Sequence, residues 1–118
     1  MPPQVEAPQY AIEIISKFDS SRSRYPVIFR EICEDNWISN RVLEEAGILP
    51  KFTTSPVFLR FPGKVLKAEG IIDLTCFREN AFKSFREFFY VVSTNKFDVL
   101  FGGKFLSSGG YSILTRSF

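Results

Sequence analysis

The stretch that decides the fold is residues 97–106, which read Phe-Asp-Val-Leu-Phe-Gly-Gly-Lys-Phe-Leu. Its first half, 97–101, is an apolar run of a length that suits a buried strand. The glycines at 102–103 break that run, and 104–106 are predicted to form one helical turn that ends near the next pair of glycines. Residues 111–115, Tyr-Ser-Ile-Leu-Thr, are then predicted to form a closing strand.

The residues that precede this stretch are also predicted to be mostly strands. Runs at 57–61, 64–77 and 81–92 are rich in aromatic and β-branched residues, which favour strands over helices. Turn-forming residues at 62–63 and 78–80 separate these runs. Short strands at this spacing, with glycine and proline in the turns, are typical of a small β-barrel or a β-sandwich.

The first part of the chain contributes a predicted hairpin. Residues 11–15 and 25–29 are two apolar runs, and the polar stretch at 19–24 has the residue types of a loop between paired strands. Residues 1–9 are rich in proline and are expected to form a flexible lead. We therefore expect a single domain over 10–118.

One helix is predicted, at 41–46. Ser39 or Asn40 can cap its first turn, because short polar side chains accept hydrogen bonds from the free N–H groups there. Gly47 stands where a left-handed residue would end the helix.

The composition excludes several kinds of site. A chain of 118 residues is long enough for one domain. It has no histidine, which excludes histidine-assisted serine or cysteine catalysis and any histidine-containing metal site. Its two cysteines, Cys33 and Cys76, are far apart and are expected to be reduced thiols. We expect neither a metal nor a cofactor.

Net charge and hydropathy indicate which partners and which cellular location to expect. A formal net charge of +2 is too small to indicate nucleic-acid binding by itself. No apolar run approaches the roughly 20 residues of a membrane-spanning helix, so no membrane partner is expected. The first eight residues lack the basic and apolar regions of a secretory signal, so we expect an intracellular location.

The order and spacing of these segments, from about Tyr10 to Thr115, resemble the retropepsin-like aspartic proteases carried by retrotransposons and by their domesticated relatives. Residues 97–106 are similar to that family's signature Tyr-Asp-Val-Ile-Leu-Gly-Arg-x-Phe-Leu, and 27–39 match its strand, polar turn, asparagine and apolar pair. The matching signature positions are Asn36, Trp37, Ile38, Asp98, Leu100 and Gly102. The positions of the family's flap turn are Phe61, Pro62, Gly63 and Lys64.

The resemblance implies an all-β fold: a small, closed, mostly antiparallel β-barrel of retropepsin type with one short helix near 40–46. It also implies a homodimer in which the chain ends interleave into a shared sheet. Residues 10–15 and 111–114 are the expected interface strands, since they would otherwise be exposed edges.

The chain departs from the family at its chemistry, because Arg30, Glu31 and Ile32 occupy the positions of the catalytic Asp-Thr/Ser-Gly. In the family, two aspartates share a proton and activate a water. A guanidinium stays protonated and cannot accept that proton, so no catalytic residue is expected here. The resemblance then implies a catalytically inactive domain that acts in homodimerisation or in peptide binding. Arg30 would lie on a cleft floor beneath the flap, where an extended peptide could bind by strand addition.

Two alternatives stay open. The chain could be an active aspartic-type peptidase with relocated carboxylates, for which Glu31 and Asp35 are the candidates. It could instead be a nucleic-acid-binding β-barrel that uses cations interleaved with phenylalanines, although acidic neighbours dilute their charge and make nucleic acid an unfavoured partner. Those cations are Arg78, Lys83, Arg86, Lys96 and Lys104.

Overall fold

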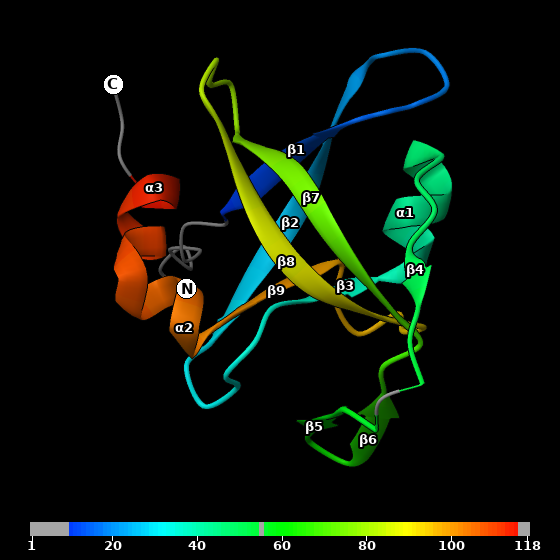
Figure 1. The fold of residues 1–118 in the computed structure, drawn as a ribbon. Coiled ribbons are helices and arrows are strands. Elements are labelled where there is room, and N and C mark those ends of the chain that lie inside the picture. Colours follow the sequence, from blue (N-terminus) through cyan, green and yellow to red (C-terminus); the bar gives the residue numbers. More distant parts are fainter. Residues whose placement is uncertain (1–9, 55, 116–118) are drawn as a thin grey trace, which may run out of the picture.

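The computed structural model describes residues 10–54 and 56–115, and it consists mostly of strands with a few short helices (Figure 1). The main sheet contains β1 (Ala11–Ile15), β2 (Arg22–Arg30), β3 (Trp37–Ser39), β4 (Lys51–Phe52), β7 (Gly70–Arg78), β8 (Ser84–Val92) and β9 (Val99–Gly102). Its strand order is β1-β2-β9-β3-β8-β7-β4, and β1 also pairs with β7, so the sheet returns upon itself. A separate hairpin is formed by β5 (Phe58–Phe61) and β6 (Lys64–Lys67).

The strand pairings are mostly antiparallel, as predicted. The exceptions among the described residues are two parallel pairs, β2 with β9 and β3 with β8. The predicted hairpin near the start of the chain is confirmed, since β1 pairs with β2 in antiparallel register from Ala11 opposite Pro26 to Ile15 opposite Arg22. The polar loop is shorter than expected because 22–24 already belong to β2.

The predicted helix is confirmed as α1 (Asn40–Ala46), which buries Val42 and Leu43. Gly47 adopts φ 70°, a left-handed conformation that suits glycine, and ends the helix as predicted. The expected side-chain cap is absent: the Ser39 hydroxyl donates instead to the carbonyl of Thr94, 2.8 Å away. Ser39 therefore ties the start of the helix to the segment after β8.

The predicted strand at 111–115 is wrong, and so is the expectation of a single short helix. The chain after β9 forms α2 (Gly103–Phe105), a wide turn η1 (Leu106–Gly110) and α3 (Tyr111–Thr115). Leu114 is buried, and the Tyr111 ring packs edge-on against Phe29 with centroids 5.5 Å apart. Two apolar side chains three residues apart lie on one face of a helix, so this segment covers the core without a strand partner.

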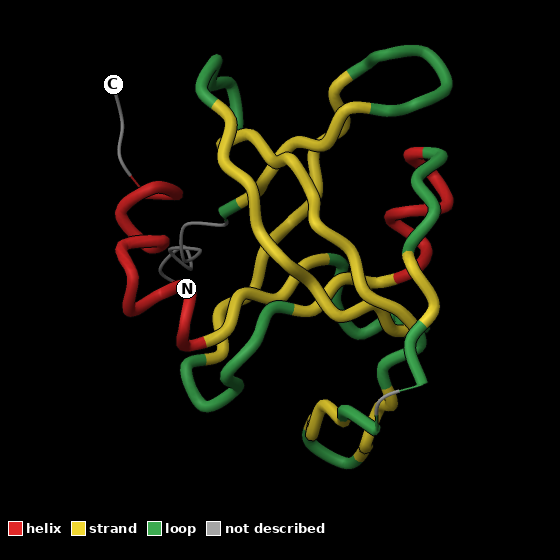
Figure 2. Tube along the Cα trace, viewed as in Figure 1, coloured by secondary structure: helices red, strands yellow, loops and turns green. Residues whose placement is uncertain are grey.

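The expected interface strands at 10–15 and 111–114 are also not available as free edges. Residues 111–114 belong to α3, and β1 pairs with β2 on one side and with β7 on the other. Figure 2 shows the helical segments on opposite sides of the sheet, with α1 on one side and α2 and α3 on the other. The chain itself therefore covers the edges that the resemblance assigned to a partner.

Two groups of buried side chains hold the fold together. The larger lies inside the returning sheet, where the rings of Phe101 and Phe105 stack with centroids 4.0 Å apart. The smaller lies between the sheet and the β5–β6 hairpin. It consists of Trp37, Leu59, Leu66, Ala68, Val92, Phe97 and Leu100. The hairpin is thus fixed to the body through its inner face.

The backbone at Gly102 leaves no room for a side chain. A Cβ there would overlap the carbonyl oxygen of Asp35 and would lie 2.7 Å from that of Cys33. We therefore expect Gly102→Ala to lower the free energy of unfolding by about 3 kcal/mol, the cost of forcing an extra carbon into packed backbone. Urea unfolding with circular dichroism detection would measure this.

Gly63→Ala is the matched control, because its Cβ would meet nothing within 4 Å. Its cost should be only about 1 kcal/mol, since the strain comes from the left-handed conformation alone, with φ 77°. Equal destabilisation by the two variants would show that the backbone around Gly102 is not closely packed.

Candidate functional site

The candidate site is the loop that follows β2. The parallel register of β2 and β9 runs from Val27 opposite Val99 to Arg30 opposite Gly102. The loop then turns sharply, with the Cys33 N–H donating to the Arg30 carbonyl at 3.1 Å. The Gly103 N–H donates in turn to the Cys33 carbonyl at 2.6 Å. These bonds fasten the loop to the start of α2, which explains why Gly102 must approach it so closely.

Asn36 closes the loop from the other side. Its side-chain oxygen accepts a hydrogen bond from the Gly102 N–H at 3.0 Å, and its amide nitrogen donates to the Phe88 carbonyl at 3.2 Å. Asn36 is buried, so these bonds are shielded from water and satisfy backbone groups of two different strands. The signature asparagine thus joins β8 and β9 beside the loop.

The other signature positions also support the loop. Trp37 and Ile38 lie in β3, which is inserted between β8 and β9. Leu100 is fully buried opposite Trp37. Asp98 forms an ion pair with Arg41 on α1, and its carbonyl accepts a hydrogen bond from the Ser39 N–H at 2.9 Å. These contacts give the signature residues a structural role.

Arg30 does reach the hairpin. Its guanidinium carbon lies 4.3 Å from the centre of the Phe61 ring, a geometry in which the cation is attracted to the ring face. Phe61 also stacks with Phe97, with 5.7 Å between the ring centroids. Pro62, Gly63 and Lys64 are exposed at the tip of the hairpin. Of the predicted flap residues, Phe61 is the one that contacts Arg30.

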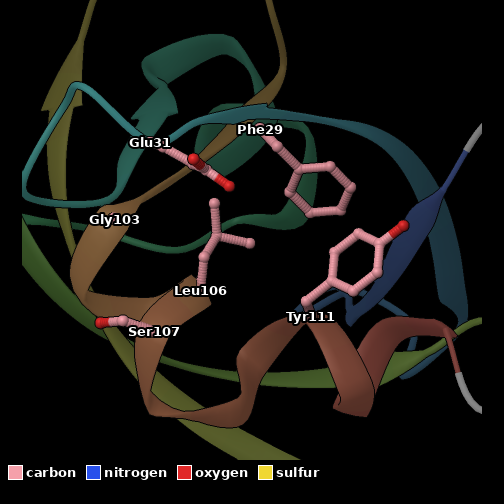
Figure 3. Close-up of a pocket in the computed structure, with 6 residues that line it drawn as sticks. All are labelled: Phe29, Glu31, Gly103, Leu106, Ser107 and Tyr111. Atoms are coloured by element: carbon pink, nitrogen blue, oxygen red, sulfur yellow. The ribbon is translucent and has the colours of Figure 1, made fainter.

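The side chain of Glu31 faces a cavity, whereas that of Ile32 is in solvent. Glu31 lines a cavity of about 560 Å³ together with Phe29, Leu106 and Tyr111 (Figure 3). Ile32 is 89% exposed at the tip of the loop. The branched side chain of Ile32 therefore projects away from the packed backbone of the loop.

Asp35 belongs to another cluster. Lys104 lies 3.6 Å from the Asp35 carboxylate and 3.1 Å from that of Glu34, and all three line a cavity of about 160 Å³. Glu31 does not line that cavity. Glu31 and Asp35, the two candidates for relocated catalytic carboxylates, therefore line separate cavities. Asp35 already has Lys104 as a cationic partner.

The sequence analysis missed Glu87, which lines the same small cavity as Asp35. Burial raises the pKa of the Glu87 carboxyl above its usual value. The signal that could have identified it is its register in β8: Glu87 shares a face with Phe85 and Phe89, which pack in the main core. A carboxylate on an apolar face is costly unless it gains a partner or a proton.

The thiols show no sign of activation. Burial raises the pKa of Cys33, and the positive charge of Arg30 only partly opposes this effect. Cys76 is buried within the main core, and burial raises the pKa of its thiol far above the ordinary value. A nucleophilic cysteine needs a lowered pKa, so neither thiol fits that role.

The described residues contain neither a cluster of metal ligands nor a helix that could cross a membrane. Over 10–54 and 56–115, histidine, cysteine, aspartate and glutamate side chains do not gather in threes as metal ligands would. In the same ranges, the helices are too short or too polar to cross a membrane. Of the cations considered for nucleic acid, Lys104 is already engaged with two carboxylates.

Comparison with known proteins adds no family assignment. No protein-family model matches the chain, and no curated protein matches it.

The raised pKa of Glu87 predicts a pH-dependent stability effect. Because the folded state takes up this proton more readily than the unfolded state, Glu87 costs stability above the ordinary glutamate pKa of about 4.3. Glu87→Gln should therefore raise the free energy of unfolding near neutral pH, and the gain should shrink as the pH falls through the raised pKa of the folded state. The gain should be absent below about pH 4, where Glu87 is protonated in both states. Urea unfolding at several pH values would measure this difference.

Asp73→Asn on the exposed face of β7 is the control, and it should show no comparable gain near neutral pH. A Glu87→Gln effect that is the same at every pH, or a loss of stability at neutral pH, would contradict the assignment of Glu87 as a buried carboxyl that resists ionisation.

Proposed function

We propose that this chain is a catalytically inactive, retropepsin-like domain that serves as a homodimerisation or peptide-binding module. The observation that carries the proposal is the side chain at the end of β2. At the point where β2 leaves its parallel pairing with β9, the chain carries Arg30, whose guanidinium packs on Phe61. A permanently protonated group at that place cannot act as a general base.

The arrangement of elements supports the retropepsin part of the proposal. A strand enters the loop, Asn36 closes it, and a short helix follows β3, in the order that the resemblance implies. The hairpin with its turn at 62–63 extends from the sheet above the same region. The returning sheet is the feature that would correspond to a retropepsin barrel.

The carboxylates near the loop support the absence of aspartic protease chemistry. That chemistry needs two carboxyl groups close enough to share one proton. Glu31 and Asp35 line separate cavities, and Asp35 is paired with Lys104. Within one chain, Glu31 and Asp35 therefore do not have the arrangement that a shared proton requires.

A dimer would use a different surface from the expected terminal strands. Two exposed apolar side chains are available near the loop: Tyr111, which lines the larger cavity, is 49% exposed, and Ile32, which follows Glu31 in the loop, is 89% exposed. Glu31 of the loop and Leu106 after α2 also line this cavity. A second copy that docks its loop at this cavity would cover apolar surface on both partners, as a two-fold interface requires.

Mutation of Ile32 would test this dimer. Light scattering should give the mass of two chains for the wild type and of one chain for Ile32→Glu, because the variant places a charge in the apolar contact. Phe82→Glu is the matched control, since Phe82 is 99% exposed on a distant turn and its substitution should leave the mass unchanged. A wild-type chain that is monomeric at every concentration would overturn the dimer.

A cleavage assay would test inactivity. Incubation with a peptide library between about pH 4 and about pH 7, a range that spans carboxyl titration, should yield no cleavage that an aspartic protease inhibitor suppresses. Inhibitor-sensitive cleavage that disappears in Glu31→Gln or in Asp35→Asn would show instead that relocated carboxylates are active.

A further inference from the structure

The β5–β6 hairpin and the chain around it concentrate positive charge. Between Glu45 and Glu69 the sequence has four basic residues and no acidic one. These are Lys51, Arg60, Lys64 and Lys67. Since the whole chain has 15 basic and 13 acidic residues, eleven basic and thirteen acidic residues remain elsewhere. The hairpin region is therefore cationic, and the rest of the chain is slightly anionic.

These four charges are not neutralised within the described part of the chain. Over 10–54 and 56–115, none of them forms an ion pair, and all four residues are exposed. Other basic residues do find carboxylate partners: Arg22, Arg24, Arg41 and Lys104. The cations of the hairpin region are thus available to carboxylates of another molecule.

The outer face of the hairpin alternates these cations with exposed apolar side chains. Phe58 lies opposite Lys67, and Arg60 lies opposite Val65. Phe58 is 54% exposed and Val65 is 61% exposed, although both are large and apolar. Leu59 belongs to the opposite face, which packs on the body. Each cross-strand pair on the outer face therefore offers one cation and one apolar contact.

The hairpin also has open edges. Among the described residues β5 and β6 pair only with each other, and in Figure 1 the hairpin stands apart from the main sheet. An edge strand presents unpaired N–H and C=O groups to which an extended peptide can add as a further strand. Side chains of an added strand point alternately to the two faces, so every second one would meet the cationic and apolar outer face.

We propose that the outer face and the open edges of the β5–β6 hairpin bind an extended peptide whose side chains on one face are acidic and apolar. The proposal rests on the proposed function as a peptide-binding module, and it names the partner's chemistry and a surface distinct from the cleft above Arg30. A peptide fits better than single-stranded nucleic acid, which needs several free aromatic rings for stacking. On the hairpin Phe58 is exposed, whereas Phe61 is engaged with Arg30 and Phe97.

Fluorescence anisotropy with the full chain would test this surface. The probe is a labelled short peptide with the repeat Glu-Ser-Val-Ser, which presents glutamate and valine alternately on one strand face and is called the glutamate–valine peptide. It is compared with a lysine–valine peptide, in which lysine replaces glutamate, and with a glutamate–valine peptide whose backbone is N-methylated. The first should bind, and the other two should not, because one has the wrong charge and the other cannot pair as a strand. The double variant Arg60→Glu and Lys67→Glu should weaken binding about tenfold or more, since it replaces attraction by repulsion at two sites.

Lys83→Glu is the control for the charge change, because Lys83 is exposed on another turn and its reversal should change the affinity less than about twofold. Unchanged thermal midpoints would show that the exposed substitutions leave the fold intact. Binding of oligothymidylate or of anionic vesicles with no binding of the glutamate–valine peptide would overturn the proposal, as would equal binding of the N-methylated peptide.

The same assay separates this proposal from the proposed function. Peptide binding that Arg30→Ala abolishes and the hairpin double variant leaves unchanged would place the peptide in the cleft, which supports the module and overturns the outer surface. Binding that depends on Arg60 and Lys67 in a chain that light scattering finds monomeric would support the outer surface and overturn the dimer. If the glutamate–valine peptide fails to bind at any salt concentration, the proposed peptide site on the outer face of the hairpin is overturned. The proposed dimer is tested separately by light scattering.

Discussion

The close approach of two backbones at Gly102 is the constraint on which the rest of the structure depends. The carbonyls of Cys33 and Asp35 lie so near this residue that only a hydrogen atom fits in place of a side chain. Asn36 then accepts the Gly102 N–H, which places its other amide group against β8. One loop, two strands and the start of α2 are thereby joined at a single place, next to the parallel pairing of β2 with β9.

Much of this could be predicted from the sequence, because the deciding features are local. The helix end at Gly47, the turn at 62–63 and the hairpin of β1 and β2 each depend on residues that are neighbours in the chain. The residues of the candidate site were expected from the resemblance and not from local patterns alone. The structure brings Arg30, Asn36 and Gly102 to one loop, and their functional role stays a prediction.

The sequence analysis failed where the structure depends on distant partners. Residues 111–115 contain Ile and Leu beside Tyr and Thr, which suits a strand, but in the structure β1 pairs with β2 and β7, and 111–115 form α3. Their apolar side chains at three-residue spacing instead suit a helix packed over Phe29. The role of Glu87 was hidden for a similar reason: a charge in a strand looks solvated until the register shows that its face is turned toward buried phenylalanines.

The residues that hold the loop are separate from those that the proposed function assigns to binding. Asn36, Gly102 and Leu100 hold the loop through buried contacts, which do not involve the side chains of Arg30 or Ile32. Ile32 projects into solvent and Arg30 rests on Phe61, so these two side chains lie outside the buried contacts of the loop. Under the proposed function these two positions serve binding, and the cation at Arg30 adds to the positive charge of the β5–β6 hairpin that it contacts.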